Sequence, residues 1–287
     1  MSKRYVLFNP KANNGAGRQE AEQLREVCKN DELTFIDVTT LSNYDDIFNS
    51  IGEDENIILC GGDGTVNRFV NAVTDEQINK TGIYYFATGT GNDFLNDLGV
   101  SKGEPILINK YLVNLPTAEI KGKTYKFLNG IGYGIDGYCC EVGDKLRETT
   151  DKPINYTAIA IKGLLFHFKP TKAKITVDGK VYEYKKVWLA PTMNGRMYGG
   201  GMIPTPNQDR LNEERTVSNM VYYGVGKLKA LIVFPSIFKG EHVAHKDMVE
   251  IHTGKDILVE YEKPCAVQVD GETILDVSSV HIRSARA

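Results

Sequence analysis

Three glycines and one aspartate follow a short apolar run, in the order Gly61-Gly62-Asp63-Gly64. Residues 57–59 are all aliphatic, as in a strand buried on both faces, and the apolar residues after the glycines recur at helical spacing. Because glycine allows close backbone approach, the N–H groups at the start of such a helix can bind an anion, and a phosphate fits that role. A tight strand-to-helix turn without a ligand is the simpler alternative.

Asp63 favours the functional alternative. A carboxylate beside bound phosphates would repel them unless a hard divalent cation, ordinarily Mg²⁺, lies between the two charges. We therefore expect this turn to bind the magnesium complex of a nucleoside polyphosphate.

The composition is that of a globular protein. The chain has 287 residues, of which 41% are apolar, which leaves room for about two domains. A net charge of −3 argues against nucleic acid as a partner. Five cysteines, an odd number without C-x-x-C spacing, argue against a disulfide framework or a zinc site and for a reducing compartment.

The N-terminus predicts a first strand rather than a signal peptide, because four apolar residues are followed at once by Asn9 and Pro10. No run approaches the ~18 apolar residues that cross a bilayer. We expect a cytoplasmic protein whose contact with the inner face of the membrane is peripheral.

Strand, loop and helix alternate four times in the first part of the chain. Apolar runs predict strands at residues 5–8, 33–38, 57–59 and 82–86, and helical spacing predicts helices at 18–29, 44–51, 66–73 and 94–98. This order is typical of a parallel sheet covered by helices on both faces. Ligands bind beyond the carboxyl ends of such strands, where three glycine-bearing loops would lie together.

The pattern changes near residue 102 to alternation with period two. It predicts a mainly antiparallel β domain, with strands at 124–128, 173–177, 181–184, 186–190, 217–223, 257–261, 266–269 and 280–283 and helices at 139–147 and 155–168. Hairpin turns are expected at Asp178-Gly179, Asp270-Gly271 and Lys121-Gly122. The predicted domains are therefore residues 1–102 and 103–287, and a return of the C-terminus to the first domain stays open.

Four motifs in order carry a resemblance to a known family. They are Gly61-Gly-Asp-Gly-Thr-Val-Asn, Thr88-Gly-Thr-Gly-Asn-Asp-Phe, Asn129-Gly-Ile-Gly-Tyr-Gly-Ile-Asp and Val269-Asp-Gly-Glu. As a set they resemble the diacylglycerol kinase catalytic family of lipid kinases, whereas the first motif alone is shared with NAD kinases. The resemblance implies a nucleotide-binding α/β domain, a β-sandwich domain and an active-site cleft between them. It also implies transfer of the γ-phosphate of ATP, with Mg²⁺, to a lipid hydroxyl, above all that of diacylglycerol to give phosphatidic acid.

The resemblance also implies roles for individual residues. The residues expected to bind the nucleotide are Asn9, Thr40, Gly61, Gly62, Asp63, Gly64, Thr65, Val66, Asn67 and Thr90. Asn92 and Asp93 would face the substrate, with a helix cap as their simpler role, and Thr40 could equally cap the next helix. Glu272 would be the general base that takes the proton of the lipid hydroxyl, whereas by sequence alone it is the exposed flank of a hairpin turn.

Two positions depart from the family pattern. Arg68 stands where the family often carries glutamate, and it would either meet an anion or be solvated. The segment 211–217 resembles a structural Mg²⁺ site, in which Leu211 and Thr216 would give carbonyl oxygens and Glu214 a carboxylate. Arg215 replaces the glycine of that motif, and a charged surface loop is the alternative.

Three questions stay open at this stage. Residues 159–174 combine apolar and lysine side chains, which suits either an anionic membrane surface or a packed helix with solvated lysines. The lipid substrate would be met at a membrane surface, and a homodimer is one alternative for the assembly. Phosphorylation of a soluble substrate such as NAD, and nucleotide binding without catalysis, are the rival functions.

Overall fold

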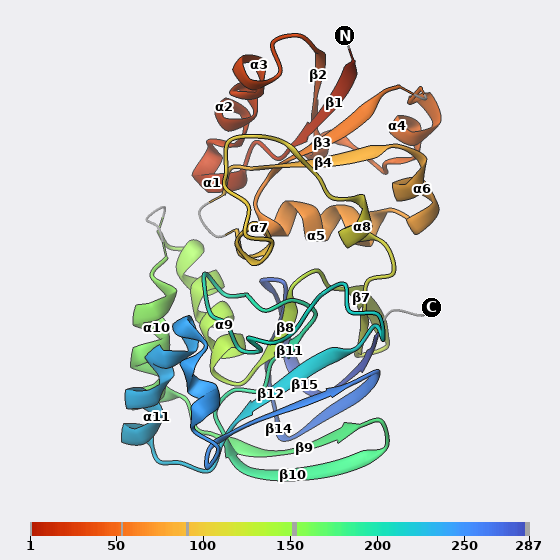
Figure 1. Ribbon diagram of the computed structural model, residues 1–287. Helices are drawn as coiled ribbons and strands as arrows, with labels where there is room; N and C mark the ends of the chain where they lie inside the picture. Colours follow the sequence, from red (N-terminus) through yellow and green to blue (C-terminus); the bar gives the residue numbers. More distant parts are fainter. Residues whose placement is uncertain (1, 53, 90–91, 151–153, 285–287) are drawn as a thin grey trace. The chain divides into compact units, whose positions relative to one another are not determined.

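Two units make up the chain, Met1–Leu115 and Pro116–Ala287 (Figure 1). The computed structural model describes residues 2–52, 54–89, 92–150 and 154–284. The first unit is an α/β layer structure and the second is built on a large antiparallel sheet. The predicted fold class, an α/β domain followed by an antiparallel β-sandwich domain, is confirmed.

The first unit contains a five-stranded sheet in the order β2-β1-β3-β4-β5. Its strands are β1 (Lys3–Phe8), β2 (Glu32–Asp37), β3 (Asn56–Gly61), β4 (Gly82–Ala87) and β5 (Ile106–Leu107). The first four pair in parallel, as predicted, and β5 joins β4 antiparallel. Successive residues of β3 are buried regardless of which face they point to, so both faces of this strand are covered.

Short helices connect these strands. They are α1 (Ala12–Gly15), α2 (Gly17–Glu22), α3 (Leu24–Val27), α4 (Asp45–Ser50), α5 (Asp63–Ala72), α6 (Asp75–Lys80), α7 (Asp93–Asp97) and α8 (Asn109–Leu112), with a 3₁₀ turn η1 (Val38–Thr40). Ala21 and Leu24 pack against Val6 and Ile58. The aromatic rings of Phe48 and Phe69 lie 6.3 Å apart and join α4 to α5.

The first unit extends past residue 102, where the sequence predicted the domain boundary. Pairing of β5 with β4 keeps residues 106–107 in the sheet. The side chain of Asn109 accepts a hydrogen bond from the N–H of Ile83 and donates to the carbonyls of Ile78 and Thr81, each at 2.7 Å. These contacts hold α8 on the first unit, and the change of sequence pattern marked the end of the helical repeats rather than the end of the unit.

The second unit contains a ten-stranded sheet whose main path runs β13-β12-β11-β8-β14-β15-β6-β7. The strands are β6 (Thr117–Ile120), β7 (Lys123–Lys126), β8 (Gly130–Tyr133), β9 (Thr171–Val177), β10 (Lys180–Val187), β11 (Thr192–Met193), β12 (Val217–Tyr222), β13 (Val249–Gly254), β14 (Asp256–Val269) and β15 (Glu272–Arg283). β9 pairs with both β10 and β14. Every pairing in this sheet is antiparallel.

The three predicted hairpin turns are present. Lys121, Asp178 and Asp270 have φ values of 51°, 48° and 45° and each precedes a glycine at positive φ, as a two-residue primed turn requires. The strands expected at 257–261 and 266–269 are instead one strand, β14. Its register against β15 shifts on both sides of Cys265, and such bulges let a strand bend without ending.

Helical segments interrupt the second sheet. They are α9 (Ile135–Arg147), α10 (Tyr156–Lys162), a π-helical turn η2 (Gly163–His167), α11 (Lys227–Val233) and two 3₁₀ turns, η3 (Phe234–Lys239) and η4 (Glu241–Ala244). The first three match the two predicted interruptions, and the last three were not predicted. None of the helices in the described part of the chain combines the length and the apolar character that crossing a bilayer requires.

A buried carboxyl group lies where α9 meets the sheet. A side chain at Gly137 would place its Cβ 1.9 Å from the carbonyl oxygen of Ala266, so only glycine lets α9 approach β14 this closely. Asp136 accepts hydrogen bonds from the Tyr198 hydroxyl and the Gly137 N–H, both at 2.9 Å, and from the Gln268 side chain. Burial nevertheless raises the pKa of Asp136 from 3.8 to about 7.

Replacement of Asp136 by asparagine should flatten the pH dependence of the second unit's stability. Between pH 4 and 7 the folded state holds a proton that the unfolded state has released, so wild-type stability falls as pH rises through this window. The raised pKa of about 7 corresponds to a loss of roughly 4 kcal/mol, which Asp136→Asn should not show. Urea unfolding followed by the fluorescence of Trp188, the single tryptophan of the chain, checks this, and parallel curves for the two proteins would contradict it.

Candidate active site

The carboxyl edge of the first sheet gathers most of the predicted nucleotide-binding residues. Phe8 pairs with both Asp37 and Cys60, and Gly61 pairs with Ala87, so the first four strands end at nearly the same level. The loops that follow β1, β3 and β4 therefore begin side by side at one edge, as the parallel order predicted.

The two glycine-rich loops of this edge are in direct contact. The N–H of Thr88 donates to the carbonyl of Gly61 at 3.0 Å, and a Cβ on Gly89 would lie 3.0 Å from the Cα of Gly62. Asn92 is buried, accepts from the Tyr85 hydroxyl at 3.1 Å and donates to the carbonyl of Gly89. Its amide thus holds the second loop in shape.

Asp63 connects the two loops. It is the first residue of α5, and its Oδ2 accepts a hydrogen bond from the N–H of Phe94, in the first turn of α7, at 3.2 Å. For Asn92 and Asp93, which the resemblance placed at the substrate, the sequence offered a cap of this helix as the simpler role. Asn92 does occupy the N-cap position of α7, but its side chain makes no capping hydrogen bond, and Asp63 supplies a carboxylate acceptor there instead.

The residues of the first loop fit a metal–phosphate group. In the first turn of α5 the N–H groups of Thr65 and Val66 donate to the carbonyl of Gly62, and helix geometry leaves the N–H groups before them without an acceptor inside the helix. A Cβ on Gly64 would meet no atom within 4 Å, so this turn borders open space. No cluster of three or more histidine, cysteine or acidic side chains suited to a metal occurs among the described residues. Mg²⁺ bound with nucleotides commonly takes one or two protein carboxylates and completes its coordination with phosphate and water oxygens, and Asp63 is the carboxylate that this loop would offer.

Other predicted nucleotide-binding residues follow the same edge. The Asn9 side chain accepts from the N–H of Lys11 at 2.9 Å. Thr40 is exposed in η1 and donates its hydroxyl to the carbonyl of Asp37 at 2.8 Å, so it does not cap the next helix. Thr65 and Val66 lie in the first turns of α5, and Asn67 is buried there. Thr90 lies outside the described residues.

Glu272 is exposed at the start of β15, directly after the Asp270-Gly271 turn. Asp270 anchors this turn, because its carboxylate accepts hydrogen bonds from three consecutive backbone N–H groups, those of Leu128, Asn129 and Gly130. Two of these distances are 2.8 and 2.9 Å. The turn that carries Glu272 is therefore tied to the loop before β8.

Further hydrogen bonds hold the Asp270-Gly271 turn and the loop before β8 to which it is tied. Gln268 accepts from the N–H of Gly271 at 2.7 Å and also hydrogen-bonds the buried carboxyl of Asp136. The buried guanidinium of Arg210 donates to the carbonyl of Leu128 at 3.1 Å. Sequence reasoning assigned no role to Gln268, Asp136 or Arg210: Asp136 is the last residue of the third motif, and no spacing singles out the other two.

The segment proposed from the sequence as a structural metal site is closed by side-chain amides. The carbonyl of Thr216 accepts from the amide groups of Gln208 and Asn212, both at 2.9 Å. Asn212 also donates to the carbonyl of Asp209 at 2.7 Å, and Glu214 is exposed. The carbonyl of Thr216 is thus already used, so this donor set does not fit a cation as it stands, and no step of the reaction is derived through one.

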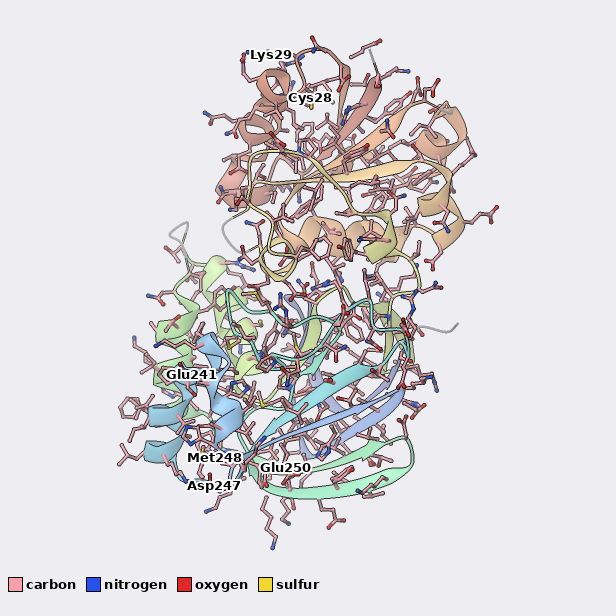
Figure 2. The ribbon with its side chains drawn as sticks, in the orientation of Figure 1. Cys28, Lys29, Glu241, Asp247, Met248 and Glu250 are labelled. Carbon is pink, nitrogen blue, oxygen red and sulfur yellow. The ribbon has the colours of Figure 1, made fainter. Side chains whose placement is uncertain are left out.

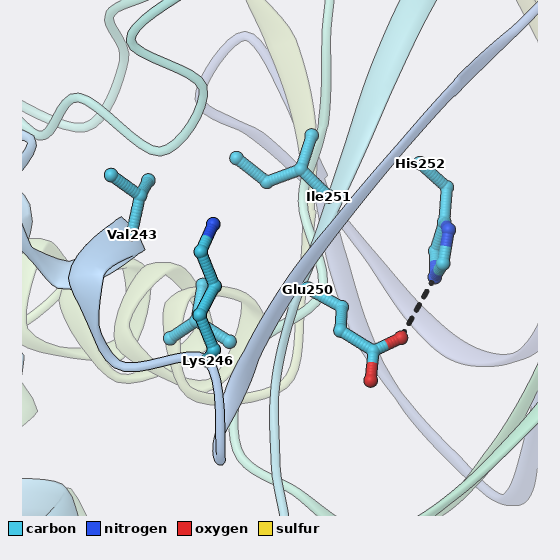
Figure 3. A pocket seen from close by; sticks show the side chains of 6 residues that line it. Val243, Lys246, Glu250, Ile251 and His252 are labelled. Carbon is cyan, nitrogen blue, oxygen red and sulfur yellow. Dashed lines mark ion pairs between the residues drawn. The ribbon is translucent and has the colours of Figure 1, made fainter.

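A recess of about 460 Å³ opens on the second unit beside β13 (Figure 3). Its lining residues are Val243, Lys246, Val249, Glu250, Ile251 and His252. Hydrogen bonds from the hydroxyls of Tyr223 and Tyr184 hold the pKa of Glu250 below its ordinary value. Because this carboxylate is committed to neighbouring tyrosines and none of the described site residues lines the recess, we do not assign the reaction to it.

Comparison with known proteins agrees with both units. Residues 3–120 match the diacylglycerol kinase catalytic domain, and residues 129–283 match the YegS C-terminal NAD kinase beta sandwich-like domain. A diacylglycerol kinase of Mycobacterium tuberculosis is 27% identical over 225 residues, which are 75% of this chain and 70% of the relative. A diacylglycerol kinase of Bacillus subtilis is 24% identical over 224 residues, again 75% and 70% of the two chains.

The fold of the whole chain is shared with a solved structure. A crystal structure of a diacylglycerol kinase from Bacillus anthracis has a TM-score of 0.64 at 23% identity, covering 99% of this chain and 94% of the other. Because the two domain matches follow the order of the two units and together span nearly all of the sequence, the chain belongs to the diacylglycerol kinase catalytic family of lipid kinases.

Proposed function

We propose that this protein is a Mg²⁺-dependent lipid kinase that transfers the γ-phosphate of ATP to the hydroxyl of diacylglycerol and forms phosphatidic acid. Membership of the family implies a kinase that uses ATP. The observation that carries the proposal is the contact of two glycine-rich loops at one sheet edge, with the Asp63 carboxylate between them. The lipid as acceptor is supported by the diacylglycerol kinases to which the chain is similar.

The first unit would hold the nucleotide. The N–H groups at the start of α5 would face the anionic phosphates, and Gly64, whose Cβ position is open, would leave room for their oxygens. Asp63 orients the metal–phosphate group, since its hydrogen bond to Phe94 limits where the carboxylate can point. A bound Mg²⁺ ion would neutralise the charge that spreads over the transferring phosphoryl group.

The second unit would supply the general base. A lipid hydroxyl is a weak nucleophile at neutral pH, and Glu272 would accept its proton as the oxygen attacks the γ-phosphorus atom. The leaving group is ADP, and the proton ends on Glu272. The anchored turn before Glu272 limits where that carboxylate can lie, which is what a positioned base needs.

A lipid panel tests the proposed reaction directly. Purified protein, Mg²⁺ and γ-³²P-labelled ATP are incubated with diacylglycerol, other hydroxylated lipids, and NAD in the absence of lipid. Label in phosphatidic acid supports the proposal. Label in NADP alone would assign the soluble-substrate reaction, and nucleotide binding without transfer to any acceptor would mark a non-catalytic nucleotide-binding protein.

Loss of either carboxylate charge should abolish most of the transfer. Asp63→Asn keeps an oxygen acceptor for the N–H of Phe94 but removes the charge that a cation needs, and we expect a loss of about 10²–10³-fold. Glu272→Gln removes the base and should cost about 10²–10⁴-fold. Initial rates at saturating ATP and lipid measure both effects, with thermal unfolding as the check on folding; wild-type rates in either variant would remove the assigned role.

Replacement of Asp270 by alanine should lower kcat by more than the accompanying loss of stability can explain. Asp270→Ala frees the turn before Glu272 from three N–H groups, and misplacement of a base by about 1 Å can cost 10²-fold. Asp178→Ala is the matched control, because Asp178 anchors another Asp-Gly hairpin through the N–H groups of Lys255 and Asp256. Both variants should lose comparable unfolding free energy, and only Asp270→Ala should lose kcat. Equal kcat losses would show that Asp270 acts only through stability.

A further inference from the structure

Three large apolar side chains stand out on the surface of the second unit. Phe166 and Leu228 are each 71% exposed and Ile232 is 69% exposed, more than any other large apolar side chain in the described part of the chain. Phe166 lies in η2, and the other two lie in α11. We call these three residues the apolar face.

The apolar face is one continuous feature although its members are far apart in sequence. The Lys227 side chain, at the start of α11, donates to the carbonyl of Leu165 in η2 at 3.0 Å, and the two elements lie side by side in the ribbon (Figure 1). Ile161 of α10, 40% exposed, lies one turn before Phe166. Exposed apolar groups gathered in this way mark an interaction surface.

α11 is apolar on both of its sides. Ala230 and Val233 face inward and belong to a buried cluster of the second unit. Leu228 and Ile232, one helical turn apart, face outward. Leu228 and Ile232 thus form an exposed apolar strip on a helix that also carries Lys227 and Lys229, and an exposed apolar strip of this kind favours contact with a partner surface.

Lysines are the only charged side chains in the two chain segments that carry the apolar face. Neither residues 154–177 nor residues 217–240 contain an aspartate or glutamate, whereas both segments contain lysines. Lys162, Lys169 and Lys239 are exposed there. Outside these segments, Asp247 forms an ion pair with Lys229, so one acidic side chain does lie beside α11; Figure 2 labels Asp247.

We propose that the apolar face inserts into the headgroup region of an anionic lipid bilayer, with the surrounding lysines at the level of the lipid phosphates. Apolar side chains ringed by lysine are the composition of peripheral membrane-binding helices. A second copy of this chain is the less favourable occupant, because a two-fold interface would place the lysines of both copies against each other. The inference deepens the proposed function by naming the surface that meets the lipid, but bilayer binding does not require phosphate transfer.

The test is vesicle binding by the full chain in the absence of ATP. Sedimentation with phosphatidylglycerol/phosphatidylcholine vesicles should show binding that weakens as the salt concentration rises and as the phosphatidylglycerol fraction falls. The variant Phe166→Ser/Leu228→Ser/Ile232→Ser should bind at least 10-fold more weakly. The variant Val27→Ser/Leu107→Ser/Val181→Ser changes three other exposed apolar side chains, which are 41%, 56% and 54% exposed and lie on other elements, and it should bind as the wild type does. Lys162→Gln/Lys169→Gln/Lys239→Gln should lose the preference for anionic vesicles.

Three results would overturn the docking proposal, and a fourth would remove only the proposed function. Wild-type protein that does not bind vesicles refutes it, as does equal binding by the two serine variants. A wild-type dimer that becomes monomeric in the apolar-face variant, without a change in vesicle binding, assigns the surface to a second copy. If the apolar face serves only to bind the bilayer, the apolar-face variant should keep its kinase activity on dispersed short-chain diacylglycerol. This measurement separates the docking hypothesis from the proposed kinase function. Vesicle binding without activity on any lipid would leave docking intact and remove the proposed function.

Discussion

The hydrogen bond from the N–H of Phe94 to the carboxylate of Asp63 is the constraint on which the nucleotide edge of the first unit depends. Parallel pairing of β3 with β4 brings two glycine-rich loops together, but neighbouring loops without a cross-link could adopt many shapes. Asp63 removes that freedom, because one side chain begins α5 and also meets the first turn of α7. A carboxylate held in this way is a pre-oriented ligand, and its position does not have to be established anew when a charged group arrives.

In the second unit, hydrogen bonds to buried polar groups fix the position of the turn before Glu272. The turn before Glu272 is anchored by Asp270 from one side and by Gln268 from the other. Gln268 in turn contacts Asp136, whose burial raises its pKa to about 7. A buried carboxyl disfavours folding when ionised, so this network costs stability near neutral pH. It also leaves every member with a hydrogen-bond partner, which gives the turn a defined position.

Local sequence patterns predicted most of the helices and strands, but they predicted fewer of the contacts between residues that are distant in the sequence. The parallel strands and the three hairpins follow from short apolar runs and from residues that tolerate positive φ, such as Asp178 and Asp270. The helix α11 was not predicted from the sequence. Apolar residues lie on both its inner and its outer side, so they do not recur with the spacing that indicates a helix. The capping of α7 by Asp63 joins residues 31 positions apart, and no spacing rule encodes such a contact. Asp136, Gln268 and Arg210 were missed for the same reason, since their roles arise only from the pairing of distant strands.

The loop at 209–216 is held in a bent shape by its own side chains although one residue of the bend is poorly suited to it. Arg215 has a φ of 55°, the left-handed conformation that glycine adopts with least strain and that costs other residues about 1–2 kcal/mol. Asn212 offsets this cost, because its amide donates to the carbonyls of Asp209 and Thr216 and accepts from the N–H of Thr216 at 2.8 Å. A neutral amide can join two carbonyl oxygens much as a cation would, without bringing a charge that needs acidic ligands. The bend is therefore maintained by hydrogen bonds within the loop, and the exposed Glu214 is not needed to close it.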